Sequence, residues 1–139
     1  MAINFHREHE GFELREKRKH KKWIGKYITQ HNKVLGTLSY IFTTNNHLRK
    51  INREFLYHDH FTDVITFDYT EATAVSGDIF ISVDQVRKNA ETYGVNFEDE
   101  LRRVMIHGVL HLLGYKDGTQ DEKVVMRKME DEALTLWEK

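Results

Sequence analysis

The chain alternates between segments whose hydrophobic residues repeat every second position and segments in which they repeat every three or four. The first pattern predicts β-strands. In residues 34–44, Leu38, Tyr40 and Phe42 fall on one face, and residues 62–69 are rich in β-branched and aromatic side chains. Four strands are expected, over residues 3–5, 34–44, 62–69 and 77–82. The close spacing of the last two predicts a hairpin or a neighbouring pair.

The second pattern predicts helices over residues 13–31, 45–56, 83–93, 96–113 and 119–137. Asn96 is an expected N-cap, with Asp99 in the third helical position behind it. Gly94 and Gly114 are expected to end helices, because glycine readily adopts a positive φ.

Two of these helices carry further expectations. Asn45 or Asn46 is the predicted cap of the helix that runs to about Leu56. The last helix is predicted to be amphipathic, with its apolar positions at Val124, Val125, Met129, Ala133, Leu134 and Leu136.

Strands and helices are mixed along the chain, and its C-terminal half is helical. This order predicts an α/β (α+β) fold in which about five helices pack on a small mixed sheet of about four strands. The 139 residues show no repeat, linker or low-complexity tract and suit a single domain over residues 1–139.

Composition narrows the possible chemistry. The absence of cysteine excludes disulfides, thiolate zinc sites and a cysteine nucleophile, so any metal must be held by nitrogen and oxygen. With 21 basic and 22 acidic residues, the overall charge predicts no partner. The N-terminus lacks the apolar run of a signal peptide, and no stretch approaches the roughly 20 apolar residues of a membrane span. A cytoplasmic protein without a membrane partner is therefore expected.

The most informative stretch is HGVLHLLGYKD, residues 107–117. His107 and His111 lie four apart and share one face of a helix. Gly114 can end that helix and turn the chain back, so that the carboxylate of Asp117 reaches the same centre. Three such ligands leave a fourth position open for water, as in catalytic zinc sites. We therefore predict one Zn²⁺ per chain.

Two histidines four apart are weak evidence alone, because core or surface histidines explain most such pairs. Here, however, the rest of the helix is apolar, so that both histidines are expected to be buried, and buried imidazoles need partners. The apolar residues are Val104, Met105, Ile106, Val109, Leu110, Leu112 and Leu113. The spacing also matches the HExxHxxGxxH motif of metzincin proteases, with Asp117 in the third place. Gly108 replaces the glutamate that serves these proteases as general base. The segment therefore favours a metal and a water without the base of peptide hydrolysis.

Three blocks resemble the YbeY family of bacterial endoribonucleases. Residues 107–117 are similar to HGxLHLxGYDH; residues 51–67, INREFLYHDHFTDVITF, to LNxxYRxxDxPTDVLSF; and residues 77–82, GDIFIS, to GDIxIS. The resemblance implies a single α/β domain with zinc at the three signature positions. It also implies hydrolysis of RNA in ribosomal RNA maturation, including the 3′ end of 16S rRNA, and in ribosome quality control.

The sequence departs from the family pattern at three positions. Asp117 stands in place of the usual third histidine and Lys116 in place of an aspartate, while Leu56 replaces an arginine suited to holding a phosphate. An aspartate keeps a zinc site intact and widens the choice toward harder ions. Candidates to replace the arginine are Arg53, His58 and His60.

The mechanism expected from these residues is hydrolysis by a metal-bound water. Arg103, one helical turn before His107, is a second candidate catalytic residue, or else a surface arginine. Thr62 and Asp63 either border the cleft or close a turn. The basic run REKRKHKK, residues 15–22, would suit RNA phosphates or form a solvated helix face.

Two alternatives stay open beside a zinc-dependent endoribonuclease that prefers single-stranded RNA. The chain could be a ribosome-associated binding factor with a mainly structural metal, which Leu56 favours. It could also be a metallohydrolase of another substrate, against which Gly108 argues. The expected partners are ribosomal RNA and a ribosomal subunit or ribosome-associated proteins, and no DNA.

Overall fold

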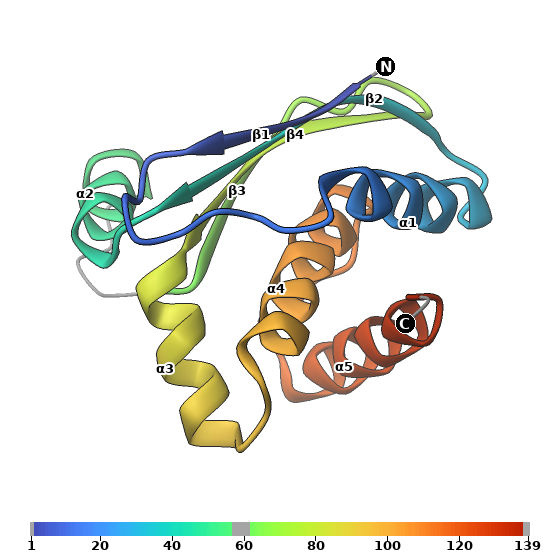
Figure 1. Ribbon diagram of the computed structural model, residues 1–139. Coiled ribbons are helices and arrows are strands. Elements are labelled where there is room, and N and C mark those ends of the chain that lie inside the picture. Colours follow the sequence, from blue (N-terminus) through green and yellow to red (C-terminus); the bar gives the residue numbers. More distant parts are fainter. Residues whose placement is uncertain (1, 57–61, 138–139) are drawn as a thin grey trace.

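The computed structural model describes residues 2–56 and 62–137 (Figure 1). Its strands are β1 (Ala2–Arg7), β2 (Val34–Thr43), β3 (Val64–Asp68) and β4 (Ala74–Ser82). Its helices are α1 (Lys17–Gln30), α2 (Asn45–Leu56), α3 (Val83–Tyr93), α4 (Phe97–Leu112) and α5 (Gln120–Thr135). The expected number and order of elements are confirmed for the part of the chain described.

The four strands form one mixed sheet in the order β1-β2-β4-β3. β1 and β4 run parallel to β2 on either side of it, and β3 pairs antiparallel with β4 as the predicted hairpin. The sheet is therefore mixed, as expected. β3 forms one edge, and α4 packs beside it.

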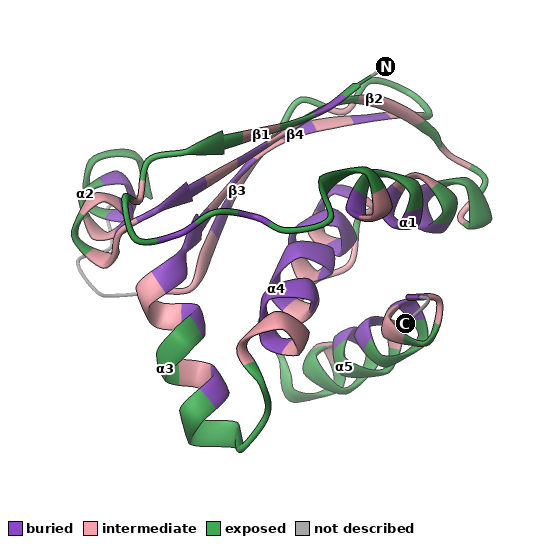
Figure 2. Ribbon diagram, in the orientation of Figure 1, coloured by how far each residue is buried: buried purple, intermediate pink, exposed green. Residues whose placement is uncertain are grey.

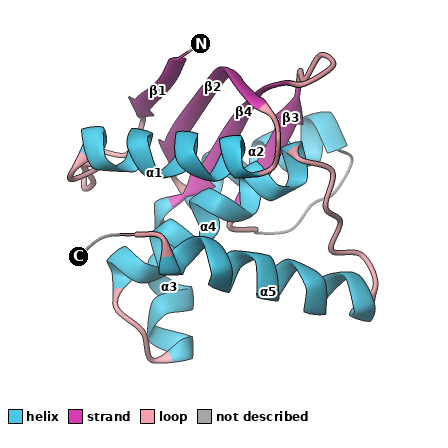
Figure 3. Ribbon diagram, turned by 90° about the vertical axis from the view of Figure 1, so that its right-hand side faces the viewer, coloured by secondary structure: helices cyan, strands magenta, loops and turns pink. Residues whose placement is uncertain are grey.

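Helices cover the sheet on both faces (Figures 1 and 3). Successive residues of a strand point to opposite faces. In β4, Ile79 lies against Gly108 of α4, so the neighbouring Phe80 points to the other face. There Leu48 of α2 packs with Ile65 of β3 in a small second core. The larger core lies under α1 and α4, and Figure 2 shows α4 as the most continuously buried helix.

Buried hydrogen bonds fix the helices over this larger core. The hydroxyl of Tyr40 in β2 donates to the carbonyl of Met105 in α4 at 3.0 Å. The indole of Trp23 in α1 donates to the carbonyl of Ala133 in α5 at 2.8 Å. α5 is thereby held against α1 as well as α4. No helix among the described residues has the length and apolar character needed to cross a membrane.

The expected start of the first helix is wrong by four residues, since α1 begins at Lys17 and not at residue 13. The preceding segment instead buries Phe12 and Leu14 in the core, while Glu13 between them is exposed. That alternation belongs to extended chain. β4, in turn, begins at Ala74, three residues before the expected start.

Two further expectations need correction. Thr44, and not Asn45 or Asn46, caps α2, because its hydroxyl accepts from the backbone N–H of His47 at 3.2 Å. The side chain of Asn45 instead accepts a hydrogen bond from Ser82.

The apolar stripe expected on the last helix is confirmed at Ala133, which is buried, and at Met129, Leu134 and Leu136, which pack against the core, but it is wrong at its first two positions. Val124 and Val125 are 61% and 47% exposed, whereas Met126, Glu130 and Ala133 form the buried face of α5. Hydrophobicity alone misses part of the buried face because that face contains a charged residue, Glu130.

Candidate metal centre

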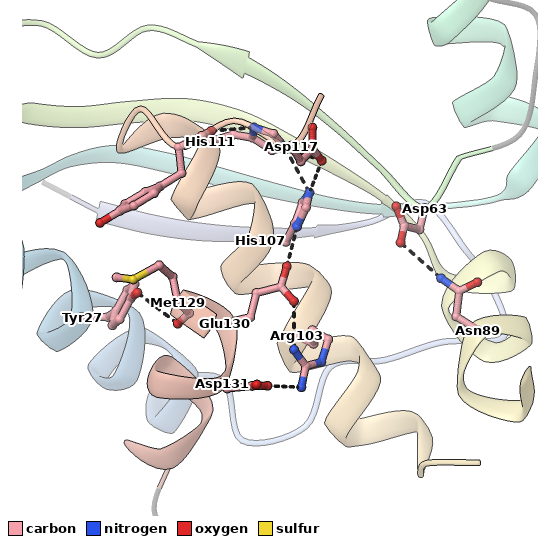
Figure 4. A network of polar contacts seen from close by, with 11 residues as sticks. Tyr27, Asp63, Asn89, Arg103, His107, His111, Asp117, Met129, Glu130 and Asp131 are labelled. Atoms are coloured by element: carbon pink, nitrogen blue, oxygen red, sulfur yellow. Dashed lines mark hydrogen bonds and ion pairs between the residues drawn. The ribbon is translucent and has the colours of Figure 1, made fainter. Parts of the chain in front are cut away.

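Helix α4 carries His107 and His111 one turn apart on the same side. The helix begins where the side chain of Asn96 accepts from the backbone N–H three residues later, as the sequence predicts. After α4 ends, Gly114 adopts a φ of 101°, which favours glycine. The chain then turns back, and Asp117 reaches the two histidines (Figure 4).

The three predicted ligands converge on one point. The Nε2 atoms of His107 and His111 lie 3.0 Å apart. The Oδ2 atom of Asp117 lies 3.1 Å from the first and 3.3 Å from the second. A tetrahedral ion with bonds of about 2.0–2.1 Å holds its ligand atoms about 3.3 Å apart. The spacing therefore fits zinc, and these residues form a group able to bind a metal.

The hydrogen bonds of the two imidazoles leave both Nε2 atoms directed at this point, where a cation would fit. His107 Nδ1 lies 2.6 Å from a carboxylate oxygen of Glu130, and His111 Nδ1 lies 3.1 Å from the carbonyl oxygen of Tyr115. Both partners are acceptors, so both Nδ1 atoms carry the proton. In that tautomer the Nε2 lone pair of each ring is directed toward Asp117, and a metal ion bound there would be coordinated by both nitrogens and the carboxylate.

The surrounding charges also favour a cation. Burial alone lowers the pKa of His107, but the hydrogen bond and charge of Glu130, together with the charges of Asp117 and Asp63, outweigh it and raise the pKa above its ordinary value. Burial raises the pKa of Asp63, and the charge of His107 opposes that effect. The site therefore concentrates negative potential where a metal would lie.

Arg103 lies one turn before His107, but its guanidinium is already paired. It donates to Glu130 at 2.9 Å and to Asp131 at 2.7 Å, and its side chain is 18% exposed. Arg103 is therefore a paired, partly buried arginine with two of its five N–H donors engaged, and its proposed part in catalysis stays a prediction. It supports the residue that contacts His107 (Figure 4).

The remaining candidates occupy different places. Asp63, at the start of β3, accepts from the side chain of Asn89 at 3.2 Å, and its carbonyl accepts from the backbone of Ser82 at 2.9 Å. Both bonds join it to residues far along the chain and do not close a local turn, and Asp63 lies within electrostatic reach of His107. Arg53 is exposed on the last turn of α2. His58 and His60 lie outside the described residues.

Glu130 is the site residue that the sequence analysis missed. It is 5% exposed and lies on the buried face of α5, between Met126 and Ala133. Acids are rarely buried unless they are paired. The available signal was its position, four residues after Met126 and three before Ala133, which places all three on one face of the helix. The sequence analysis assigned only hydrophobic residues to the buried face and therefore left Glu130 out.

The comparison with known families decides the identity. A family model described as Endoribonuclease YbeY matches residues 3–138. The chain belongs to the YbeY family. Bacterial relatives agree with this assignment. A protein named Endoribonuclease YbeY from Flavobacterium psychrophilum is 48% identical over 91% of this chain and 90% of its own. Its counterpart from Bacteroides thetaiotaomicron is 40% identical over 98% of this chain and 99% of its own.

A solved structure agrees with the YbeY fold. The solution structure of a protein from Thermotoga maritima matches with a TM-score of 0.63 and covers 98% of this chain and 91% of that one. The sequence identity is 24%, so the match concerns the fold alone. The small α/β domain expected from the sequence is thus confirmed.

Proposed function

We propose that this protein is a zinc-dependent endoribonuclease that prefers single-stranded RNA. One observation carries the proposal: the lone pairs of His107, His111 and Asp117 converge at 3.0–3.3 Å with both Nδ1 atoms engaged as donors. Membership of a family described as endoribonucleases supplies the substrate class, which is RNA.

When bound, zinc supplies an activated water and polarises a phosphoryl oxygen. His107, His111 and Asp117 would hold the ion and would leave a coordination position for water or substrate. Gly108, beside His107, brings no base, and its position against Ile79 leaves no room for one. The site is therefore suited to a phosphodiester better than to a peptide.

Groups outside the three ligands bind the RNA in this proposal. Lys17, Arg18 and Lys21 are exposed on α1, and such cations attract phosphates. Arg53, exposed near Leu56, is the proposed substitute for the family's arginine. Arg103 contributes through Glu130, to which it donates, while a second N–H donates to Asp131.

The wider biological setting is part of the same proposal. We place the activity in the cytoplasm, at ribosomal RNA maturation including the 3′ end of 16S rRNA, and in ribosome quality control. The partners are then a ribosomal subunit or ribosome-associated proteins. Residues 1–139 would act as a single domain of this kind.

A second candidate function is a ribosome-associated binding factor whose metal mainly holds the fold. The observation in its favour is Leu56, an apolar side chain that is 40% exposed where the family pattern has arginine. Weaker stabilisation of a phosphate would leave binding intact and reduce cleavage.

The test is metal content together with RNA cleavage. We expect about one zinc per chain in the wild type, by elemental analysis of protein purified without added metal. The Asp117→Ala variant should lose most of it, because one of three ligands is gone. The Lys116→Ala variant is the matched control, changed in the same turn without touching the ligands, and should keep its zinc.

The outcomes separate the two functions. Cleavage of single-stranded RNA by the metal-loaded wild type and the Lys116→Ala variant, but not by the Asp117→Ala variant, supports the nuclease. Bound zinc without cleavage supports the binding factor. A wild type that takes up no metal even when zinc is offered would contradict both.

A further inference from the structure

Glu130 connects the last helix to the metal centre. Its side chain is 7% exposed, and both of its carboxylate oxygens have a partner. Oε2 accepts from Nδ1 of His107 at 2.6 Å, and Oε1 accepts from Arg103 at 2.9 Å. His107 and Glu130 are 23 residues apart in the chain, so only the packing of α5 on α4 joins them.

We propose that Glu130 is a positioning residue for the metal, acting through His107. Its carboxylate holds the proton on Nδ1 of His107, so that the Nε2 lone pair is free to bind the ion. The same hydrogen bond makes Nε2 more basic and therefore a stronger metal ligand. The inference rests on the proposed metal binding.

The second histidine provides an internal comparison. His111 donates its Nδ1 proton to the carbonyl of Tyr115 at 3.1 Å, which is longer than the 2.6 Å contact of His107. Bonds to a carboxylate are shorter and stronger than bonds to a neutral carbonyl. His107 is therefore the better supported of the two nitrogen ligands.

Arg103 and Asp131 complete the arrangement. Arg103 donates to Glu130 through one nitrogen and to Asp131 through another, at 2.9 and 2.7 Å. It compensates the buried charge of Glu130 and fixes one oxygen of the carboxylate, which leaves the other directed at His107. Asp131 is 58% exposed and meets Arg103 only from the solvent side. Removing Asp131 thus disturbs Arg103 without removing the contact to His107.

This difference provides a matched pair of variants. Glu130→Gln keeps the shape of the side chain and removes its charge beside both Arg103 and His107. Asp131→Asn removes a neighbouring charge that Arg103 also contacts. We expect the zinc dissociation constant, measured by competition with a chromophoric chelator, to rise by about 10-fold or more in Glu130→Gln. In Asp131→Asn it should stay within about 2-fold of the wild type, because the His107 ligand keeps its carboxylate.

A spectroscopic readout separates positioning from simple stability. In zinc-loaded wild type, the Nδ1 proton of His107 should resonate downfield of that of His111, because its acceptor is a nearby carboxylate. In Glu130→Gln the His107 signal should move upfield while the His111 signal stays in place. A purely structural role for Glu130 would move neither signal selectively.

Several results would overturn the inference. Equal zinc affinity in Glu130→Gln and the wild type would do so, as would equal losses in Glu130→Gln and Asp131→Asn. If Glu130→Gln fails to fold, the wild-type spectrum still tests the inference. An Nδ1 proton of His107 that resonates upfield of that of His111 would contradict a strong hydrogen bond to the Glu130 carboxylate. Failure of the wild type to bind zinc at all would count against the proposed function itself, and so is distinct from these results.

Discussion

Gly108 shows how a single position limits the chemistry of this site. It directly follows His107, at the position where the metalloprotease motif has its glutamate. A Cβ atom placed there would lie 2.8 Å from Cγ2 of Ile79, which is fully buried in β4. α4 thus approaches the sheet at a distance that only glycine permits, and a protease-like base has no space.

At the residue scale we predict that Gly108→Ala destabilises the protein. Overpacking a close contact in the core costs about 1–3 kcal/mol, which should outweigh the roughly 0.5–1 kcal/mol that alanine contributes over glycine in a helix. The free energy of unfolding from urea titrations would measure this. Gly25→Ala is the matched control, because a Cβ at that helical position meets nothing within 4 Å. Alanine there should stabilise α1 by about 0.5–1 kcal/mol. Equal effects of the two substitutions would contradict the close approach of α4.

At the scale of the element, α1 has two different faces. Its exposed face carries the basic run, while its buried face presents His20, Trp23 and Ile24 to the core. His20 is 1% exposed and packs on Trp137, with ring centroids 4.6 Å apart. Its Nδ1 bonds to the carbonyl of Glu16, but its Nε2 has no partner among the described residues. A charged imidazole would be costly in this position.

The burial of His20 predicts that the free energy of unfolding depends on pH and falls in acid. Burial, with the charge of Arg102, lowers the pKa of His20 below its ordinary value of 6.5. The unfolded chain therefore binds a proton that the folded chain resists, and stability should fall as the pH drops below 6.5. In His20→Asn, whose amide can still bond to Glu16, that part of the slope should disappear. Unfolding free energies of both proteins between pH 7.5 and about 5 would show it; parallel curves would contradict the prediction.

At the scale of the whole molecule, a net charge of −1 conceals an uneven distribution. Negative groups gather around the metal centre, including Asp63 and Glu130, and basic groups gather on the exposed face of α1. RNA carries one negative charge per phosphate and would be attracted to that helix face. The metal would then offset the negative potential of the centre itself.

We predict that reversing charges on α1 weakens RNA binding. The triple variant Lys17→Glu, Arg18→Glu and Lys21→Glu should raise the dissociation constant for single-stranded RNA at low salt. It should also reduce the dependence of binding on salt, by about 0.7 in logarithmic slope for each lost phosphate contact. Fluorescence anisotropy at several salt concentrations measures both.

A control with the same change in net charge gives this prediction its specificity. The exposed lysines Lys88, Lys123 and Lys128 lie on α3 and α5. Their reversal should affect binding much less if the RNA follows α1. Equal losses in both triple variants would mean that only the overall charge matters, and unchanged binding in the α1 variant would remove this helix from the RNA-binding surface.

The sequence by itself determined the order of the elements, the hairpin of β3 and β4, and the cap at Asn96, because these depend on residues close in the chain. It also determined the metal group, since His107, His111 and Asp117 fall within eleven residues, and one helical turn and one glycine turn bring them together. Local periodicity and turn chemistry are sufficient for such features.

Only the tertiary structure decided which residues support that group. Glu130 meets His107 across 23 residues, and Arg103 pairs with a helix that begins after the metal motif has ended. The strand order β1-β2-β4-β3 and the burial of His20 against Trp137 likewise join distant parts of the chain. The pattern along one helix cannot specify the partner of a buried charge, because that partner is set by how whole helices pack.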